Sequence, residues 1–231
     1  MKWSVVRHLT LLRETAAAFA KRYRRRARAG HAPAPSPRFA FHTGARPGEQ
    51  IAATCWRRGD ISASQGLVFV ANNDVANKNV RLLAIDPSST IAGQRSHPIA
   101  GPYDAVIWGI ASDADSVFFT VNAADGGVYR VRSSTGAVDE IASGECFPGE
   151  LAIDGSRVYW VNRGRDSVGA AGACAGTAVR AIGKDGTCAG LSPCPQTLVD
   201  GPPAPSGLAL SSQRVYYTSE TPDGGVFFTS K

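Results

Sequence analysis

The feature that most constrains the fold of this chain is an internal repeat. Residues 51–72 and 141–162 align without gaps, with Ile, Ala, Gly, Val and Asn at equal offsets. Two further copies begin at Ala111 and Ala209, and each has a Val six residues later with two aromatic residues directly after it. The four anchoring valines are Val68, Val117, Val158 and Val215. A unit that recurs every roughly 40 to 60 residues predicts a repeat architecture in which neighbouring units bury one another.

Each unit contains short apolar runs separated by turn residues, which predicts four antiparallel strands. In the third copy the predicted strands are 150–153, 158–162, 177–183 and 196–199, and Asp154-Gly155 forms the first turn. In the second copy we expect strands at 128–132 and 137–142, and in the fourth at 207–210, 214–219 and 225–229. Units of this length and strand content are typical of β-propeller blades. The predicted fold is therefore all-β, a β-propeller of about four blade-like, four-stranded antiparallel repeats.

The aromatic residues of the repeats are expected to form the core between blades. They follow the anchoring valines as Tyr159-Trp160, Phe118-Phe119 and Tyr216-Tyr217. A four-stranded sheet cannot bury both of its faces alone, so stacked blades cover each other through large side chains.

The count of strands leaves closure of the propeller open. The fourth copy supplies only three strands, whereas residues 49–54 align with the fourth strand of a blade. Pairing of 49–54 with 225–229 would complete the last blade and close the ring, which removes exposed strand edges. The alternative is a fragment of a larger propeller.

The positive charge of the chain lies almost entirely in its first 30 residues. This segment holds nine Lys and Arg and one Glu, whereas the remainder holds 16 basic and 18 acidic residues. The domain division predicted is a basic N-terminal helix or arm with a Pro-rich linker over 1–37, and a propeller domain over 38–231. Since the folded body is slightly acidic, no nucleic-acid partner is expected. Charged residues interrupt the apolar positions of 3–20, so no membrane span is expected either.

The third unit, GELAIDGSRVYWVN followed by a Gly-rich loop and TAVRAIGKDG, resembles the repeats of YWTD, NHL and gluconolactonase-like propellers, and especially those of predicted myxobacterial repeat proteins. The resemblance covers about residues 49–231. The turn of this unit is shorter than in YWTD blades, and the unit ends in Val161-Asn162 where those blades end in Thr-Asp. The likeness to lactonases implies a metal-dependent lactonase, or related sugar-acid hydrolase, with Ca²⁺ or another divalent ion in the central channel.

Candidate metal ligands are polar residues predicted on one face of the propeller. Of these, Glu150, Asn122 and Asn162 are the set expected to converge if a metal is bound. The alternative is that they are turn and cap residues, because Asn and Asp favour turns for local reasons. The four histidines show no metal-binding spacing, and the sequence contains no G-x-S-x-G or P-loop motif. No catalytic or cofactor-binding residue is therefore predicted.

Five cysteines are present, and none has CxxC spacing. Four of them, Cys146, Cys174, Cys188 and Cys194, fall in one blade. The predicted topology places the first two on one face of that blade and the last two on the other. We therefore predict disulfides Cys146–Cys174 and Cys188–Cys194, with Cys55 free. Disulfides indicate an oxidising, extracytoplasmic compartment: periplasm, cell surface or exterior.

Together these observations predict a monomeric, non-catalytic binding or scaffold module that needs no cofactor and has a protein or carbohydrate ligand. The lactonase is the alternative, and convergence of several inward carboxylates and amides would distinguish it.

Overall fold

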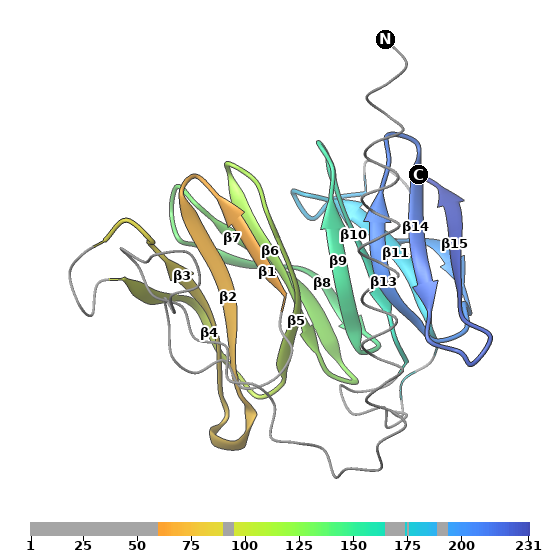
Figure 1. The fold of residues 1–231 in the computed structure, drawn as a ribbon, viewed down its shortest axis with the longest axis horizontal. Coiled ribbons are helices and arrows are strands. Elements are labelled where there is room, and N and C mark those ends of the chain that lie inside the picture. The colour runs from red at the N-terminus through yellow and green to blue at the C-terminus, as the bar shows by residue number, and fades with distance from the viewer. Residues whose placement is uncertain (1–59, 90–94, 165–173, 175, 189–193) are drawn as a thin grey trace, which may run out of the picture. The chain divides into compact units, whose positions relative to one another are not determined.

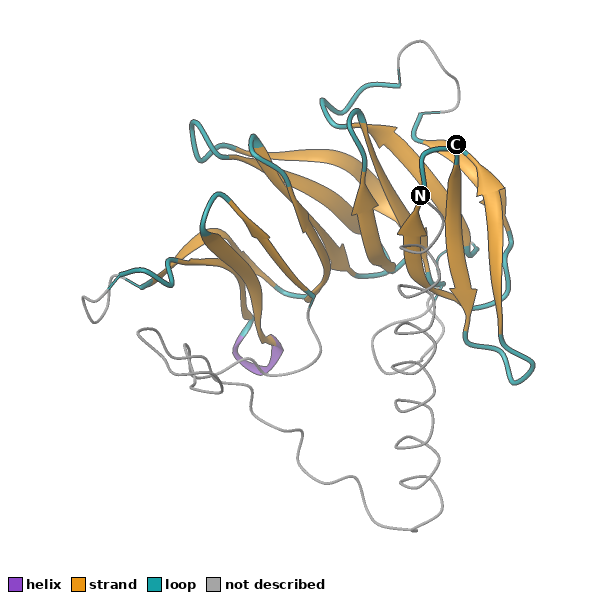
Figure 2. Cartoon of the chain, turned by 45° about the horizontal axis from the view of Figure 1, so that its top comes forward, coloured by secondary structure: helices purple, strands orange, loops and turns teal. Residues whose placement is uncertain are grey.

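A computed structural model describes residues 60–89, 95–164, 174, 176–188 and 194–231. They form four antiparallel sheets, and in each sheet neighbouring strands are consecutive in the chain (Figures 1 and 2). The sheets lie in one compact unit, Arg38–Lys231.

The strands of each sheet are as follows. The first sheet holds β1 (Ile61–Ser64), β2 (Leu67–Asp74), β3 (Asn79–Ile85) and β4 (Ser96–Tyr103), with a short 3-10 helix, η1 (Val75–Asn77), between β2 and β3. The second holds β5 (Val106–Ser112), β6 (Ser116–Asn122), β7 (Gly126–Arg132) and β8 (Val138–Glu145). The third holds β9 (Pro148–Ile153), β10 (Arg157–Asn162), β11 (Ala178–Gly183) and β12 (Gln196–Asp200). The fourth holds β13 (Pro205–Leu210), β14 (Arg214–Ser219) and β15 (Gly225–Ser230).

The predicted blade pattern is confirmed, with strand ends that differ by at most three residues. The largest difference is β8, which continues to Glu145 where the sequence predicts an end at Ala142. Among the described residues the fourth sheet has three strands, which are the three that its repeat copy predicts. The predicted strand at 49–54 and Cys55 lie outside the described residues. Within those residues, no helix has the length and apolar character needed to cross a membrane.

The anchoring motifs form the core between consecutive sheets. Phe118 of β6 packs with Val158 and Trp160 of β10, and Tyr159 of β10 packs with Val215 and Tyr217 of β14. Alternate side chains of each second strand thus face the preceding and the following sheet, as the period of a strand requires. The predicted inter-blade role of these aromatic residues is confirmed where a following sheet is present.

Asparagine side chains tie the end of one second strand to the first strand of the next sheet. Asn73 is buried and makes two bonds to Ile107: its amide nitrogen donates to the carbonyl oxygen and its Oδ1 accepts from the backbone N–H, both at 2.9 Å. Asn122, at the same position of the next sheet, donates to the carbonyl oxygen of Pro148 at 3.0 Å. Because proline has no N–H, Oδ1 of Asn122 has no partner among the described residues.

This difference predicts unequal costs for two matched substitutions. Asn73→Ala leaves both the N–H and the C=O of buried Ile107 unpaired, so we expect a loss of about 2–3 kcal/mol of unfolding free energy. Asn122→Ala removes one bond, and the expected loss is about 1 kcal/mol. Urea unfolding of the two variants measures both values. Equal losses would contradict the assignment of two bonds to Asn73.

The predicted disulfide pairing is confirmed. Cys146 is bonded to Cys174 and Cys188 to Cys194. Both bridges lie in the third repeat, where the sequence clusters its cysteines: Cys146 precedes β9, Cys174 lies between β10 and β11, and Cys188 and Cys194 lie between β11 and β12.

Candidate functional site

A β-bulge recurs in the first strands of three sheets and changes the direction of the side chains at that point of each strand. The pairing register shifts within 107–110 of β5, 148–151 of β9 and 205–208 of β13. Such bulges re-aim side chains and are frequent beside functional sites. The repeat pattern of the sequence does not predict them.

Acidic residues and glycines alternate at one position of the repeat. Asp60, Gly109, Glu150 and Gly207 each stand eight residues before the anchoring Val. The last three lie within the bulged segments, and Asp60 directly precedes β1. A Cβ at Gly109 would lie 2.7 Å from the Gly149 carbonyl oxygen, so only glycine lets β5 approach β9 this closely.

The carboxyl groups of Asp60 and Glu150 form a hydrogen-bonded pair. Burial raises the pKa of Glu150 to about 7, and the charge and hydrogen bond of Asp60 contribute in the same direction. Glu150 can therefore take up and release a proton near neutral pH.

The raised pKa predicts how stability depends on pH. Because folded Glu150 binds its proton more tightly than unfolded Glu150, its contribution is present at low pH and is lost as pH rises through 7. The free energy of unfolding of Glu150→Gln, relative to that of the original chain, should rise by up to about 2 kcal/mol as the pH increases from 5 to 8. This is less than the full linkage value because Glu150 is partly exposed. Urea unfolding of both proteins at the two pH values measures this gain.

Asp60→Asn is the matched variant for this experiment. It removes the neighbouring charge while Glu150 keeps its burial, so the loss of stability between pH 5 and pH 8 should become smaller without disappearing. An unchanged pH dependence in both variants would show that Glu150 does not titrate in this range.

A second charged group lies beside the bulges. The Arg163 guanidinium stands 4.1 Å from the centre of the Trp108 ring and 3.4 Å from Oε2 of Glu220. Its side chain crosses Gly149, where a Cβ would lie 2.5 Å from Cδ of Arg163. Arg163 thus connects the second, third and fourth sheets, and its side chain is only 6% exposed.

The three predicted metal ligands lie near one another in the backbone but bind different partners. Asn162 pairs with Pro148 in the ladder, and Asn122 binds the Pro148 carbonyl, two residues before Glu150. The Asn162 side chain, however, donates to Glu145 at 2.7 Å, and the carboxyl of Glu150 is paired with Asp60. Among the described residues no group of three or more His, Cys, Asp or Glu side chains is placed to hold a metal ion. The metal set remains a prediction.

Glu145 is a polar residue that the sequence did not single out. Its side chain is completely buried and accepts from Arg180 at 2.8 Å, from Asn162 and from the Trp160 indole N–H at 3.1 Å. These partners come from β10 and β11, so a carboxylate at the end of β8 joins the second sheet to the third. The position next to Cys146, in a segment rich in small and polar residues, gives no sign of burial.

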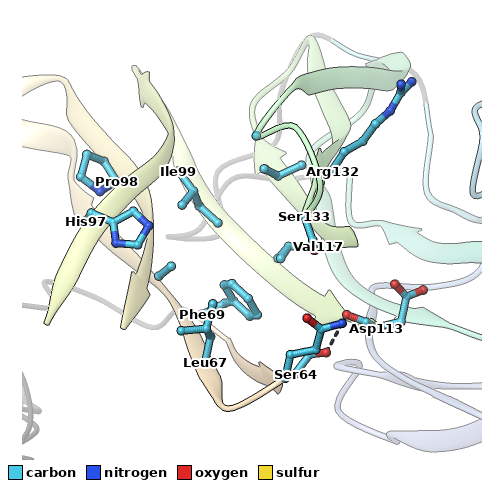
Figure 3. Close-up of a pocket in the computed structure, with 14 residues that line it drawn as sticks. Ser64, Leu67, Phe69, His97, Pro98, Ile99, Asp113, Val117, Arg132 and Ser133 are labelled. Atoms are coloured by element: carbon cyan, nitrogen blue, oxygen red, sulfur yellow. Dashed lines mark hydrogen bonds between the residues drawn. The ribbon is translucent and has the colours of Figure 1, made fainter. Parts of the chain in front are cut away.

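A pocket of about 440 Å³ lies between the first and second sheets (Figure 3). Its apolar lining comes mainly from β2, β4 and β6, and its polar rim from the turns and strand ends at the same edge of the sheets. The lining includes Leu67, Phe69, Ile99 and Val117 as apolar residues, and Ser64, Gln65, His97, Asp113, Arg132 and Ser133 as polar residues. A volume of roughly 300–1,000 Å³ is usual for ligand pockets.

The polar groups of the rim are mostly engaged within the protein. Ser64 Oγ donates to the Asp113 carbonyl at 2.6 Å, and the Gln65 amide donates to the Ala114 carbonyl at 2.7 Å. Burial alone would raise the pKa of the Asp113 carboxyl, but the bond from Lys184 at 2.6 Å and two backbone N–H groups hold it below its usual value. The pocket therefore presents an apolar interior with a neutralised rim.

Comparison with known proteins identifies the fold. No protein-family model matches the chain, and no curated protein matches it in sequence. The computationally designed Ika4 protein is 15% identical with a TM-score of 0.51, over 79% of this chain and 98% of Ika4. The designed Ika8 protein is 16% identical with a TM-score of 0.51, over 80% of this chain and 50% of Ika8.

A putative TolB from Agrobacterium tumefaciens is 12% identical with a TM-score of 0.50, over 71% of this chain and 57% of that chain. The chain thus spans nearly all of Ika4, but only about half of the Ika8 and TolB chains. These likenesses and the four antiparallel sheets show an all-β fold made of β-propeller blades.

Proposed function

We propose that this chain is a non-catalytic binding module of an oxidising, extracytoplasmic compartment, and that the pocket between its first and second sheets receives an apolar side chain of a protein partner. The observation that carries the proposal is the lining of this pocket. The apolar lining lies at the boundary of two blades: Leu67 and Ile99 are partly exposed, and Phe69 and Val117 are buried. Burial of one apolar side chain contributes roughly 1.5–3 kcal/mol to binding before ordering costs.

The chemistry of the rim favours an apolar group over an anion or a sugar. Asp113 is neutralised by Lys184, and Arg132 lies 3.0 Å from Asp139. Sugars usually stack on an exposed aromatic face, whereas Phe69, the aromatic residue of the lining, is only 6% exposed. A protein partner with a Leu-sized or Phe-sized anchor fits this surface best.

The two disulfides support the compartment. Thiols are kept reduced in most cytosols, and disulfides form and persist in oxidising environments. Cys146–Cys174 and Cys188–Cys194 are both at bonding distance in the folded blade.

A titration with small probes tests the binding site. We expect N-acetyl-phenylalanine amide to cause saturable changes in the NMR signals of Leu67, Ile99 and Val117, and methyl glucoside to cause none there. Ile99→Arg places a charge in the lining and should weaken the response at least about tenfold. Thr197→Arg, at an exposed position of β12 in the third sheet, is the control and should bind as the original chain does. A response to methyl glucoside alone would favour a carbohydrate ligand, and no response to either probe would overturn the proposal.

A further inference from the structure

The outer face of the fourth sheet has the composition of an inter-blade core but no sheet packed on it among the described residues. The residue after the anchoring Val faces the following sheet in each blade, and Phe69, Phe118 and Tyr159 are buried there at 6%, 1% and 1% exposure. Tyr216 has this position in the fourth sheet and is only partly buried.

The neighbours of Tyr216 on the same face are more exposed. Phe228 lies opposite Tyr216 on β15 and is 57% exposed, and Val226 lies opposite Thr218 and is 72% exposed. The rings of Tyr216 and Phe228 stand 6.1 Å apart, with the Arg214 guanidinium 4.3 Å from the Phe228 ring. An exposed apolar face of this kind indicates an interaction surface.

Thr218 adds a second observation, because it repeats an inter-blade hydrogen bond of the second sheet. There, Thr120 Oγ1 accepts from the Gly109 N–H at 2.9 Å and donates at 2.7 Å to the Gly149 carbonyl of the following sheet. In the fourth sheet, Thr218 Oγ1 accepts from the Gly207 N–H at 2.8 Å. Its nearest described hydroxyl, Ser206 at 3.0 Å, belongs to its own sheet, so the bond to a following sheet is missing among the described residues.

The sequence of the first blade contains the residue type that would accept the missing bond from Thr218. In the sequence, the gapless repeat aligns Gly59-Asp60 with Gly149-Glu150, the pair whose glycine carbonyl accepts from Thr120; Gly59 itself lies outside the described residues. The first sheet also exposes an apolar side chain, Ile61, at 51%. The first blade therefore has the residues expected of a blade that follows a sheet with a Gly–Thr hydrogen bond, such as Gly207–Thr218.

The first sheet of the same chain does not cover this face. Both views place the first and the fourth sheets at opposite ends of the row of sheets (Figures 1 and 2). The four sheets align with nearly the whole of the Ika4 chain and with half of the Ika8 chain. A second row of the same kind can thus continue the first.

We propose that the outer face of the fourth sheet binds the first sheet of a second copy of this chain, and that two chains join end to end in a closed pair. Tyr216, Val226 and Phe228 of one copy pack against the first sheet of the other, and Thr218 regains its inter-blade bond. Each pair has two identical interfaces of this heterologous type, and the second closes the assembly. A dimer then replaces the monomer expected from the sequence.

Sedimentation equilibrium of the full 231-residue chain with intact disulfides tests the pair. We expect a mass of twice 24.2 kDa at high protein concentration. The double variant Val226→Lys/Phe228→Lys and the single variant Ile61→Lys should each be monomeric, because both interfaces of a homogeneous pair carry the added charge. Val138→Lys, at an exposed position of β8 away from this face, is the control and should remain dimeric. Circular dichroism verifies that each variant is folded.

Mixing the two monomeric variants gives the most specific result. A pair of one Ile61→Lys chain and one Val226→Lys/Phe228→Lys chain retains one interface in which neither surface is altered. The mixture should therefore contain dimers that neither variant forms alone. An original chain that stays monomeric, an Ile61→Lys chain that still dimerises, or a mixture without dimers would each overturn the proposal.

Discussion

Replacement of Glu145 by Ala is expected to lower the free energy of unfolding by about 3–5 kcal/mol. The carboxylate is completely buried, and Arg180, Asn162 and Trp160 all donate to it. Its removal leaves a guanidinium, which is only 21% exposed, without its counter-charge, and leaves the Asn162 amide without its acceptor. Urea unfolding measures the loss.

Two further variants separate the lost charge pair from the lost packing. In Glu145→Ala/Arg180→Met no uncompensated charge remains, so the double variant should recover much of the stability. Asp104→Ala removes the partner of Lys78 at a surface pair in which both side chains are 74% exposed, and should cost less than about 1 kcal/mol. A loss for Glu145→Ala as small as that for Asp104→Ala would show that the buried pair does not join the sheets.

The core was predictable because it depends on a local pattern that recurs. A Val followed by two large side chains, close behind a turn, identified β6, β10 and β14 from the sequence alone. Trp160 and Phe119 are buried as expected, since each motif needs only a neighbouring sheet of the same kind. Tyr216 follows the same pattern and is only partly buried, because no described sheet covers its face.

The polar sites were not predictable in the same way, because their partners are distant in the chain. The burial of Glu145 depends on Arg180, 35 residues later. Glu150 was predicted as a metal ligand, but its pairing with Asp60 depends on a bulge in β9 and on Gly109, which lets β5 approach β9 closely. The pocket likewise combines residues of two blades that no local pattern relates.

The disulfides were predictable from topology, and their unequal loop lengths give the second large effect. Replacement of Cys146 and Cys174 by Ala should cost about 3.6 kcal/mol by the chain-entropy relation, since the bridged residues are 28 apart. The same change at Cys188 and Cys194, which are six apart, should cost about 2.2 kcal/mol. Alanine is used because Cys146 is buried, where a serine hydroxyl would need a hydrogen-bond partner.

Urea unfolding of the two double variants under oxidising conditions measures the difference, which the relation sets at about 1.4 kcal/mol in favour of the longer loop. Both variants lack two cysteines and keep the other bridge, so each is the other's control. In an excess of reductant the two variants and the original chain should converge, because neither bridge then restricts the unfolded chain. If the order were reversed, the stabilisation would come from contacts of the Cys188–Cys194 loop in the folded blade, and loop closure in the unfolded chain would not explain it.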